Sequence, residues 1–125
     1  MANPLLAVNF VADAAIAINR LVKFGTGDRN VTPAVAATDF IIGVVNETAI
    51  AIGERCDVVR MGIAWVECGA AVPRGSPITA DAVGRAVVAA PAAGVNNRII
   101  GFADETGTAA GDVIRFMIEP GLMQG

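Results

Sequence analysis

Histidine and tyrosine are absent from this sequence of 125 residues, and lysine, serine and tryptophan occur once each. The absence of histidine removes the commonest acid–base catalyst and the commonest metal ligand. It also excludes Ser–His–Asp and Cys–His sites within the chain. The one serine, Ser76, lies in a Gly-Ser-Pro turn with no base beside it. The sequence therefore predicts a protein that is not an enzyme and that has no cofactor and no metal site.

Positive charge is also scarce. The chain has nine Lys and Arg residues against twelve Asp and Glu residues, and its eight arginines are scattered along the sequence without forming a run. Nucleic-acid binding depends on clustered positive charge, so we expect no nucleic-acid partner. The apolar segment near the start lacks a basic region and is interrupted by Asn9 and Asp13. It predicts neither a signal peptide nor a membrane span, and we expect synthesis in the cytoplasm.

The two cysteines, Cys56 and Cys68, are separated by eleven residues. This spacing matches neither a redox CxxC motif nor a zinc finger. Both lie in apolar, strand-like runs, which favours buried free thiols in a reducing compartment over the alternative of a disulfide.

Hydrophobic residues, mostly Ala, Val and Ile, make up 54% of the chain, and charged residues only 17%. Typical domains have about 25% charged residues. The excess of apolar residues indicates that some apolar surface lies against other subunits. Val and Ile with glycine at intervals favour short β-strands.

One stretch of the sequence occurs twice. Residues 41–53 read IIGVVNETAIAIG, and residues 99–111 read IIGFADETGTAAG. The identical positions are Ile41/Ile99, Ile42/Ile100, Gly43/Gly101, Glu47/Glu105, Thr48/Thr106, Ala51/Ala109 and Gly53/Gly111. We interpret this as an internal duplication of one supersecondary unit, in which a strand with a glycine where no side chain fits leads into a turn.

Strand-like runs recur between Gly, Pro and Asp turns, a pattern typical of all-β barrels and sandwiches. We expect a small β-barrel or sandwich built from two similar halves. Residues 1–12 are expected to form an extended N-terminal arm, with an ordinary first strand as the alternative. Residues 13–125 are expected to form a single β domain, duplicated over about 20–60 and 84–120, that ends in an exposed tail from residue 119. Small residues on one face of the strand at 61–68 are expected to line a barrel interior.

Glu47 and Glu105 are the candidates for paired catalytic carboxylates. The favoured interpretation is structural, with each Glu-Thr pair hydrogen-bonding the backbone of its connection. A cation site that adds Asn46 and Asp104 follows no calcium-loop spacing.

The stretch 61–125 resembles the tailed-phage capsid cement, or head decoration, protein family. The residues that carry the resemblance are Gly69, Val72, Gly75, Ile78, Asp81 and Gly84, followed by Ile100, Gly101, Ala103, Glu105, Ala110, Gly111 and Asp112. The N-terminal half matches more loosely, through AAIAINRLVKFG and IIGVVNET.

The resemblance implies a structural virion protein, made in the host cytoplasm, that binds the outside of a phage head and stabilises the shell. Its implied partners are the major capsid protein and other copies of itself, as a homotrimer or alternatively a dimer. The alternative function is a non-catalytic, β-clip-like ligand-binding module or a subunit of a host enzyme, because GAAVPRGSPIT resembles a β-clip turn. Trp65 is expected either to pack in the core or to be an interface hot spot. The candidate interface residues are Leu5, Leu6, Val8, Phe10, Trp65, Leu122 and Met123.

Overall fold

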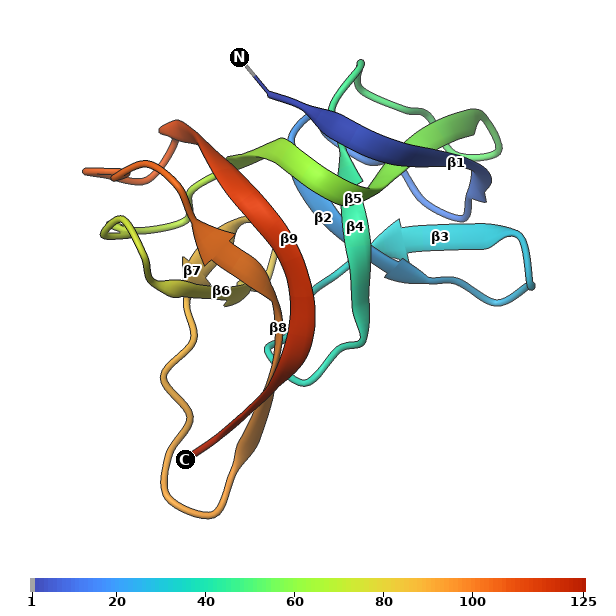
Figure 1. The fold of residues 1–125 in the computed structure, drawn as a ribbon. Helices are drawn as coiled ribbons and strands as arrows, with labels where there is room; N and C mark the ends of the chain where they lie inside the picture. The colour runs from blue at the N-terminus through green and yellow to red at the C-terminus, as the bar shows by residue number, and fades with distance from the viewer. Residues whose placement is uncertain (1) are drawn as a thin grey trace.

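The computed structural model describes residues 2–125, and their regular structure consists of β-strands (Figure 1). The strands are β1 (Pro4–Ala12), β2 (Arg20–Phe24), β3 (Asn30–Pro33), β4 (Ile41–Val45), β5 (Arg55–Glu67), β6 (Pro77–Ala80), β7 (Ala86–Val88), β8 (Asn96–Ala103) and β9 (Val113–Gln124). The prediction of an all-β fold is confirmed.

The strands are hydrogen-bonded in the order β1-β3-β2-β4-β5-β9-β8-β6-β7, and β1 also pairs with β5. This extra pairing closes the first five strands into a barrel. In Figure 1 the first half lies on the right and the second half on the left, and β5 runs from one to the other. β5 therefore belongs to both halves.

The second half repeats the pairing pattern of the first, with the end of β5 in the place of β1. Phe10↔Cys56 corresponds to Val66↔Ile114, Val22↔Gly43 corresponds to Ile78↔Gly101, and the parallel pair Ala12↔Val31 corresponds to Cys68↔Ala86. The expectation of two similar halves is thus confirmed. The repeated strand pairing covers residues 10–56 in the first half and 66–114 in the second half. The identical residues, by contrast, are concentrated in one hairpin of each half. Origin by duplication stays a prediction.

The expected N-terminal arm is a strand of the body over most of its length. β1 pairs antiparallel with β5 and, at its end, parallel with β3, and Phe10 and Ala12 are buried. The physical reason is that β1 covers the open edges of β3 and β5, which would otherwise leave unpaired backbone groups. Met1 lies outside the described residues. The expected exposed tail is also a strand, because β9 continues to Gln124 along β8.

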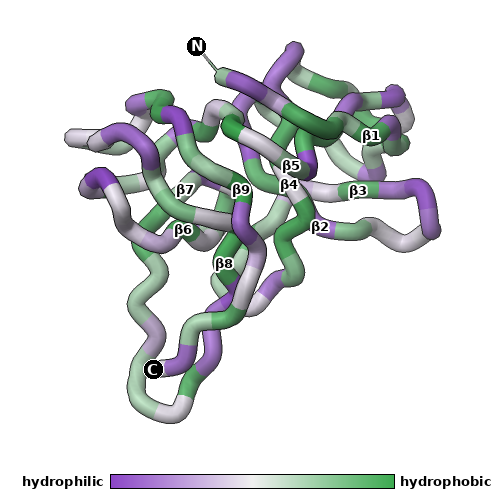
Figure 2. The backbone as a smooth tube through the Cα atoms, in the orientation of Figure 1, coloured by the Kyte–Doolittle hydropathy of each residue, from purple (hydrophilic) through white to green (hydrophobic). Residues whose placement is uncertain are grey.

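Each half has its own apolar core. The first core contains Phe10, Ala12, Ile16, Val22, Val31, Ile42, Val45, Ile50, Cys56 and Val58. The second contains Val66, Cys68, Val72, Ile78, Ala86, Ile100, Ile114 and Phe116, together with residues such as Leu21 and Val44 from the first half. In Figure 2 many of the outlying turns are hydrophilic, although the β7–β8 loop at the bottom is pale green to white, and the strands where the two halves meet are largely hydrophobic.

The strand predicted at 61–68 is the second part of a longer continuous strand, β5, which begins at Arg55. Gly62, with a φ of 97°, lies inside it, opposite Pro4 of β1. The small side chains of Ala64 and Cys68 are buried, as expected for a barrel interior, whereas Met61 is exposed. The positive φ lets one strand pass from the barrel of the first half into the sheet of the second half.

The doubled glycines occupy equivalent crowded sites. A Cβ atom on Gly43 would overlap the carbonyl oxygen of Val59, and a Cβ atom on Gly101 would overlap that of Met117. In both halves the glycine allows β4 or β8 to lie against the strand that follows it in the hairpin.

We expect Gly101→Ala to destabilise the protein by about 3 kcal/mol, because the added methyl group meets backbone rather than a flexible side chain. The measurement is the free energy of unfolding in urea. Gly121→Ala, on the neighbouring strand β9, is the matched control, because its nearest contact would be an ordinary 3.6 Å from Ile99. Equal stability of the two variants would contradict the crowding argument.

Candidate interface

The predicted interface residues come from β1 and from the ends of β5 and β9, and they differ in exposure. Leu5 is 78% exposed, Leu122 61% and Leu6 44%. The side chains of Val8, Trp65 and Met123 are half-buried. Phe10 is only 5% exposed and belongs to the first core, so its side chain is not available to a partner. The sequence missed this because β1 turns the face that carries Phe10 and Ala12 inward.

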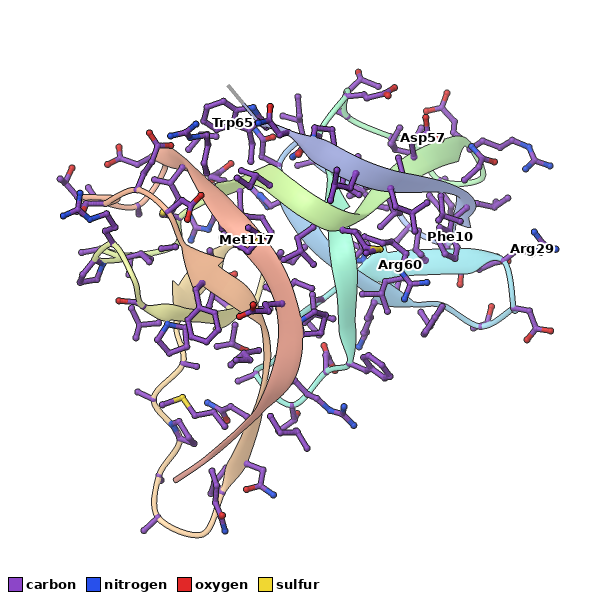
Figure 3. All side chains as sticks on the ribbon, viewed as in Figure 1. Phe10, Arg29, Asp57, Arg60, Trp65 and Met117 are labelled. Carbon is purple, nitrogen blue, oxygen red and sulfur yellow. The ribbon has the colours of Figure 1, made fainter. Side chains whose placement is uncertain are left out.

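Trp65 is half-buried near the end of β5 and lies at the upper left in Figure 3. The side chain of Asn46 hydrogen-bonds to its backbone. The Asn46 side-chain amide donates to the Trp65 carbonyl at 2.8 Å, and its oxygen accepts from the Trp65 N–H at 3.0 Å. The same amide donates to Asn19 Oδ1 at 3.0 Å. Asn46 thus substitutes for a neighbouring strand and joins the β4–β5 loop to the second half of β5.

Replacement Asn46→Ala is expected to cost about 1–3 kcal/mol, because it leaves the partly buried N–H and C=O groups of Trp65 without their partner. Urea unfolding followed by the fluorescence of Trp65 measures the loss. Asn96→Ala, at the exposed start of β8, is the control and should unfold at the wild-type midpoint. If the unfolding curves of the two variants coincide, the proposed structural role of Asn46 is contradicted.

An apolar groove of about 500 Å³ lies where β1 begins, beside the bend of β5 and the middle of β9. Its lining includes Leu5, Met61 and Met117, together with Arg60, Glu119 and Pro120. Met61 is 53% exposed and Met117 40%. The groove exists because β1 starts pairing with β5 at Gly62, while β9 pairs with β5 only from Ile63 onward.

A row of aromatic rings adjoins this groove. Phe10, Phe24 and Phe40 stand edge to face, with centroids 6.3 Å and 6.2 Å apart. The guanidinium of Arg60 lies 5.7 Å from the centre of the Phe24 ring, and that of Arg98 lies 4.7 Å from Phe40. Phe24 and Phe40 are about half exposed, so the outer end of the row faces solvent.

Sequence reasoning missed Phe24, Phe40, Arg60 and Arg98. These residues come from three strands and one loop, and no local spacing connects them. The one available signal was that each phenylalanine stands at the border of a turn, where a large apolar side chain has no local packing partner.

The doubled glutamates have different surroundings. The Glu105 carboxylate accepts the backbone N–H of Arg115 at 2.8 Å, which confirms the structural role predicted for it. Glu47 is exposed and lines a shallow hollow with Asn9 and Arg55. Within residues 2–125, no group of three or more acidic or cysteine side chains is arranged to hold a metal ion.

Both cysteines are buried and unpaired, as expected. Burial raises the pKa of the Cys56 thiol, with a contribution from Asp57. Burial also raises the pKa of Cys68, with contributions from Asp112 and Glu67. The protonated thiol is the unreactive form, so both side chains act as small apolar core residues.

The acidic side chains organise turns. Asp112 accepts hydrogen bonds from the N–H and hydroxyl of Thr108 and from the N–H of Ala109. These bonds, led by the Thr108 backbone, hold the pKa of Asp112 below its ordinary value of 3.8. The pKa of Asp13 is lowered in the same way, first by the Thr26 backbone and then by Asn30.

A lowered pKa in the folded state means that ionised Asp112 contributes stability above pH 3.8, and that this contribution is lost as the pH falls through the folded pKa. We therefore expect Asp112→Asn to be less stable than wild type at neutral pH, with the difference shrinking below pH 3.8. Urea midpoints measured across this range test the expectation. A gap that stays constant with pH would show that the carboxylate charge is not involved.

A family model described as phage cement protein matches residues 2–118 of the chain. The chain belongs to this family. It is therefore a structural protein of the phage head, found in the virion capsid, and the resemblance seen in the sequence is confirmed. The family is one of structural proteins, in keeping with the scarcity of catalytic groups in the sequence.

The fold of this cement protein has a counterpart among solved structures. The crystal structure of the head fiber gp8.5 N base in bacteriophage phi29 superposes with a TM-score of 0.71 at 18% identity. The match covers 91% of this chain and 93% of that chain. No curated protein matches the sequence. In the part of the chain that the structure describes, no helix is long and apolar enough to cross a membrane.

Proposed function

We propose that this cement protein binds the outer surface of the phage head as a homo-oligomer, expected to be a trimer, and stabilises the shell of major capsid protein. The observation that carries the proposal is the number of large apolar side chains left on the surface of a protein from a cement family. Leu5, Ile52, Met61, Phe40 and Leu122 are each more than half exposed.

Exposed apolar area of this extent is typical of a surface that binds another protein. Each contact with the shell removes apolar area from water, at about 25 cal/mol per Å² before the cost of ordering. Identical sites repeat over the whole shell, so a modest free energy at each site becomes a large resistance to bursting. An oligomer that bridges several shell subunits adds avidity, because its second contact forms at a high effective concentration.

Two features of the fold suit a protein that must resist mechanical stress. The first barrel is closed through β1, so few strand edges are left open in that half. The two halves are joined by the continuous strand β5 and by the Arg20–Glu67 ion pair at 3.4 Å. The two halves are thus connected directly through a shared strand rather than through a flexible linker.

Expanded heads that lack the protein are expected to bind it and to retain their genome to a higher temperature. Co-sedimentation on a density gradient measures binding, and release of DNA on heating measures stabilisation. Heads that already carry the protein serve as the control and should gain neither mass nor heat resistance. Protein that stays at the top of the gradient while the heads remain intact would overturn the proposal.

Light scattering of the purified protein tests the oligomer separately, with an expected mass of three times the chain mass of 12.7 kDa. A monomer that binds a small molecule would instead support the β-clip-like ligand-binding alternative.

A further inference from the structure

The groove and the aromatic row form one continuous surface, which we name the Phe–Met surface. It consists of Leu5, Phe24, Phe40, Met61 and Met117 with Arg60 and Arg98. Arg60 lines the groove and also lies over Phe24. Pro120 lines the groove and also a small hollow with Phe40 and Arg98. Figure 3 shows Met117 on β9 and Arg60 near β4, both on the side facing the viewer.

The composition of the Phe–Met surface is that of a protein interface. Phenylalanine, methionine and arginine are enriched in interfaces relative to the rest of a protein surface. Flexible methionines line the groove, and aromatic rings with stacked arginines form its extension. A partner that covers this surface must accept hydrogen bonds from the two guanidinium groups, because each has five donors.

Arg60 and Arg98 have no carboxylate partner within the described residues. The cations of the ion pairs there are Arg20, Lys23, Arg85 and Arg115. Arg60 and Arg98 instead stack on exposed phenylalanine rings, which fixes the planes of their guanidinium groups. An arginine held in this way is ready to bind a carboxylate from outside. The occupant should therefore combine an apolar side chain with acidic neighbours.

The chain itself carries such a segment in the loop between β4 and β5. Ile52 is 71% exposed at the turn of this loop, and Glu47 and Glu54 are exposed on either side of it. In Figure 1 the loop leaves the upper end of β4 and returns to β5 at the right-hand edge of the molecule.

The fold does not need an isoleucine at this turn. The equivalent loop of the second half has Ala110 in the position of Ile52, and it makes the same turn with Gly111 in the place of Gly53. The acidic residue after the glycine holds the turn in both halves, since Glu54 accepts from the Ala51 N–H and Asp112 accepts from the Ala109 N–H. Ile52 is therefore left without a role inside its own chain.

We propose that the Phe–Met surface of one copy binds the 46–54 loop of a second copy. Ile52 fills the groove between Leu5, Met61 and Met117, and the two glutamates of the loop pair with Arg60 and Arg98. The contact joins two different surfaces head to tail, and such a contact closes into a ring when the rotation between copies allows it. The inference rests on the proposed oligomer and names the surfaces that build it.

A mixing experiment tests this contact directly. The loop variant Ile52→Glu keeps an intact Phe–Met surface, and the surface variant Met61→Glu/Arg98→Glu keeps an intact loop. At a concentration where wild type is oligomeric by light scattering, we expect each variant alone to be a monomer. A mixture of the two should form a one-to-one dimer and nothing larger, because one intact loop meets one intact surface.

Two single substitutions calibrate the result. Ile52→Ala copies the residue found in the second half, so it should fold normally and weaken association at least tenfold, as loss of an interface hot spot does. Val113→Glu is the control, because it places the same charge on another exposed apolar residue, 44% exposed, at the start of β9 and away from the groove. It should oligomerise like wild type. Circular dichroism and the thermal midpoint of each variant establish that it is folded.

Three results would overturn the inference: a wild type that is monomeric, variants that keep the wild-type mass, or folded monomeric variants that form no dimer when mixed. If the wild type is a monomer and the surface variant fails to bind heads, the shell protein occupies the Phe–Met surface. In that case the head-binding part of the proposal stands without the self-contact. Failure of the wild-type protein to bind heads would instead refute the proposed function.

Discussion

The structure depends on a single strand that belongs to both halves. β5 is 13 residues long, and its first part pairs with β1 and β4 while its last part pairs with β9. The change of partners takes place at Gly62, whose φ of 97° suits glycine and whose Cα approaches β1 too closely for a side chain, since a Cβ would be 2.6 Å from the Asn3 carbonyl. The apolar groove lies at this change of partners. The bend that joins the two halves therefore also creates the surface proposed to bind a second copy.

The two halves agree in their interiors and differ on their surfaces. Equivalent register pairs and equivalent glycines occur in both halves, because core packing tolerates few changes of volume. Surface positions have diverged, so that an exposed isoleucine at 52 corresponds to an alanine at 110. Phe40 and Arg98 each stand directly before the repeated Ile-Ile pair of their half. The guanidinium of Arg98 stacks on the Phe40 ring. The differences between the halves thus lie where partners would bind.

Several polar side chains in this protein form hydrogen bonds with backbone groups. Asn46 takes the place of a missing strand beside Trp65, Glu105 accepts the N–H of Arg115, and Asp112 holds its turn. In each case the side chain satisfies a backbone group that a short connection leaves unpaired. This use of side chains gives Glu105 an architectural role, whereas its counterpart Glu47 is exposed and shows no such contact with the backbone.

The sequence by itself determined the features that depend on short-range chemistry. The all-β class follows from Val and Ile between Gly, Pro and Asp turns, and the doubled stretch located Gly43 and Gly101, where a side chain has no room. The absence of histidine and the Gly/Asp turn signatures pointed to a structural protein of the cement family. The tertiary structure alone decided that residues 4–12 close a barrel, that Phe10 is buried while Phe24 is exposed, and that Arg60 and Arg98 stack on Phe24 and Phe40. The physical reason is that which face of a strand is buried, and which side chains meet across a sheet, depends on register between segments far apart in the chain, and the local spacing of residues does not encode that register.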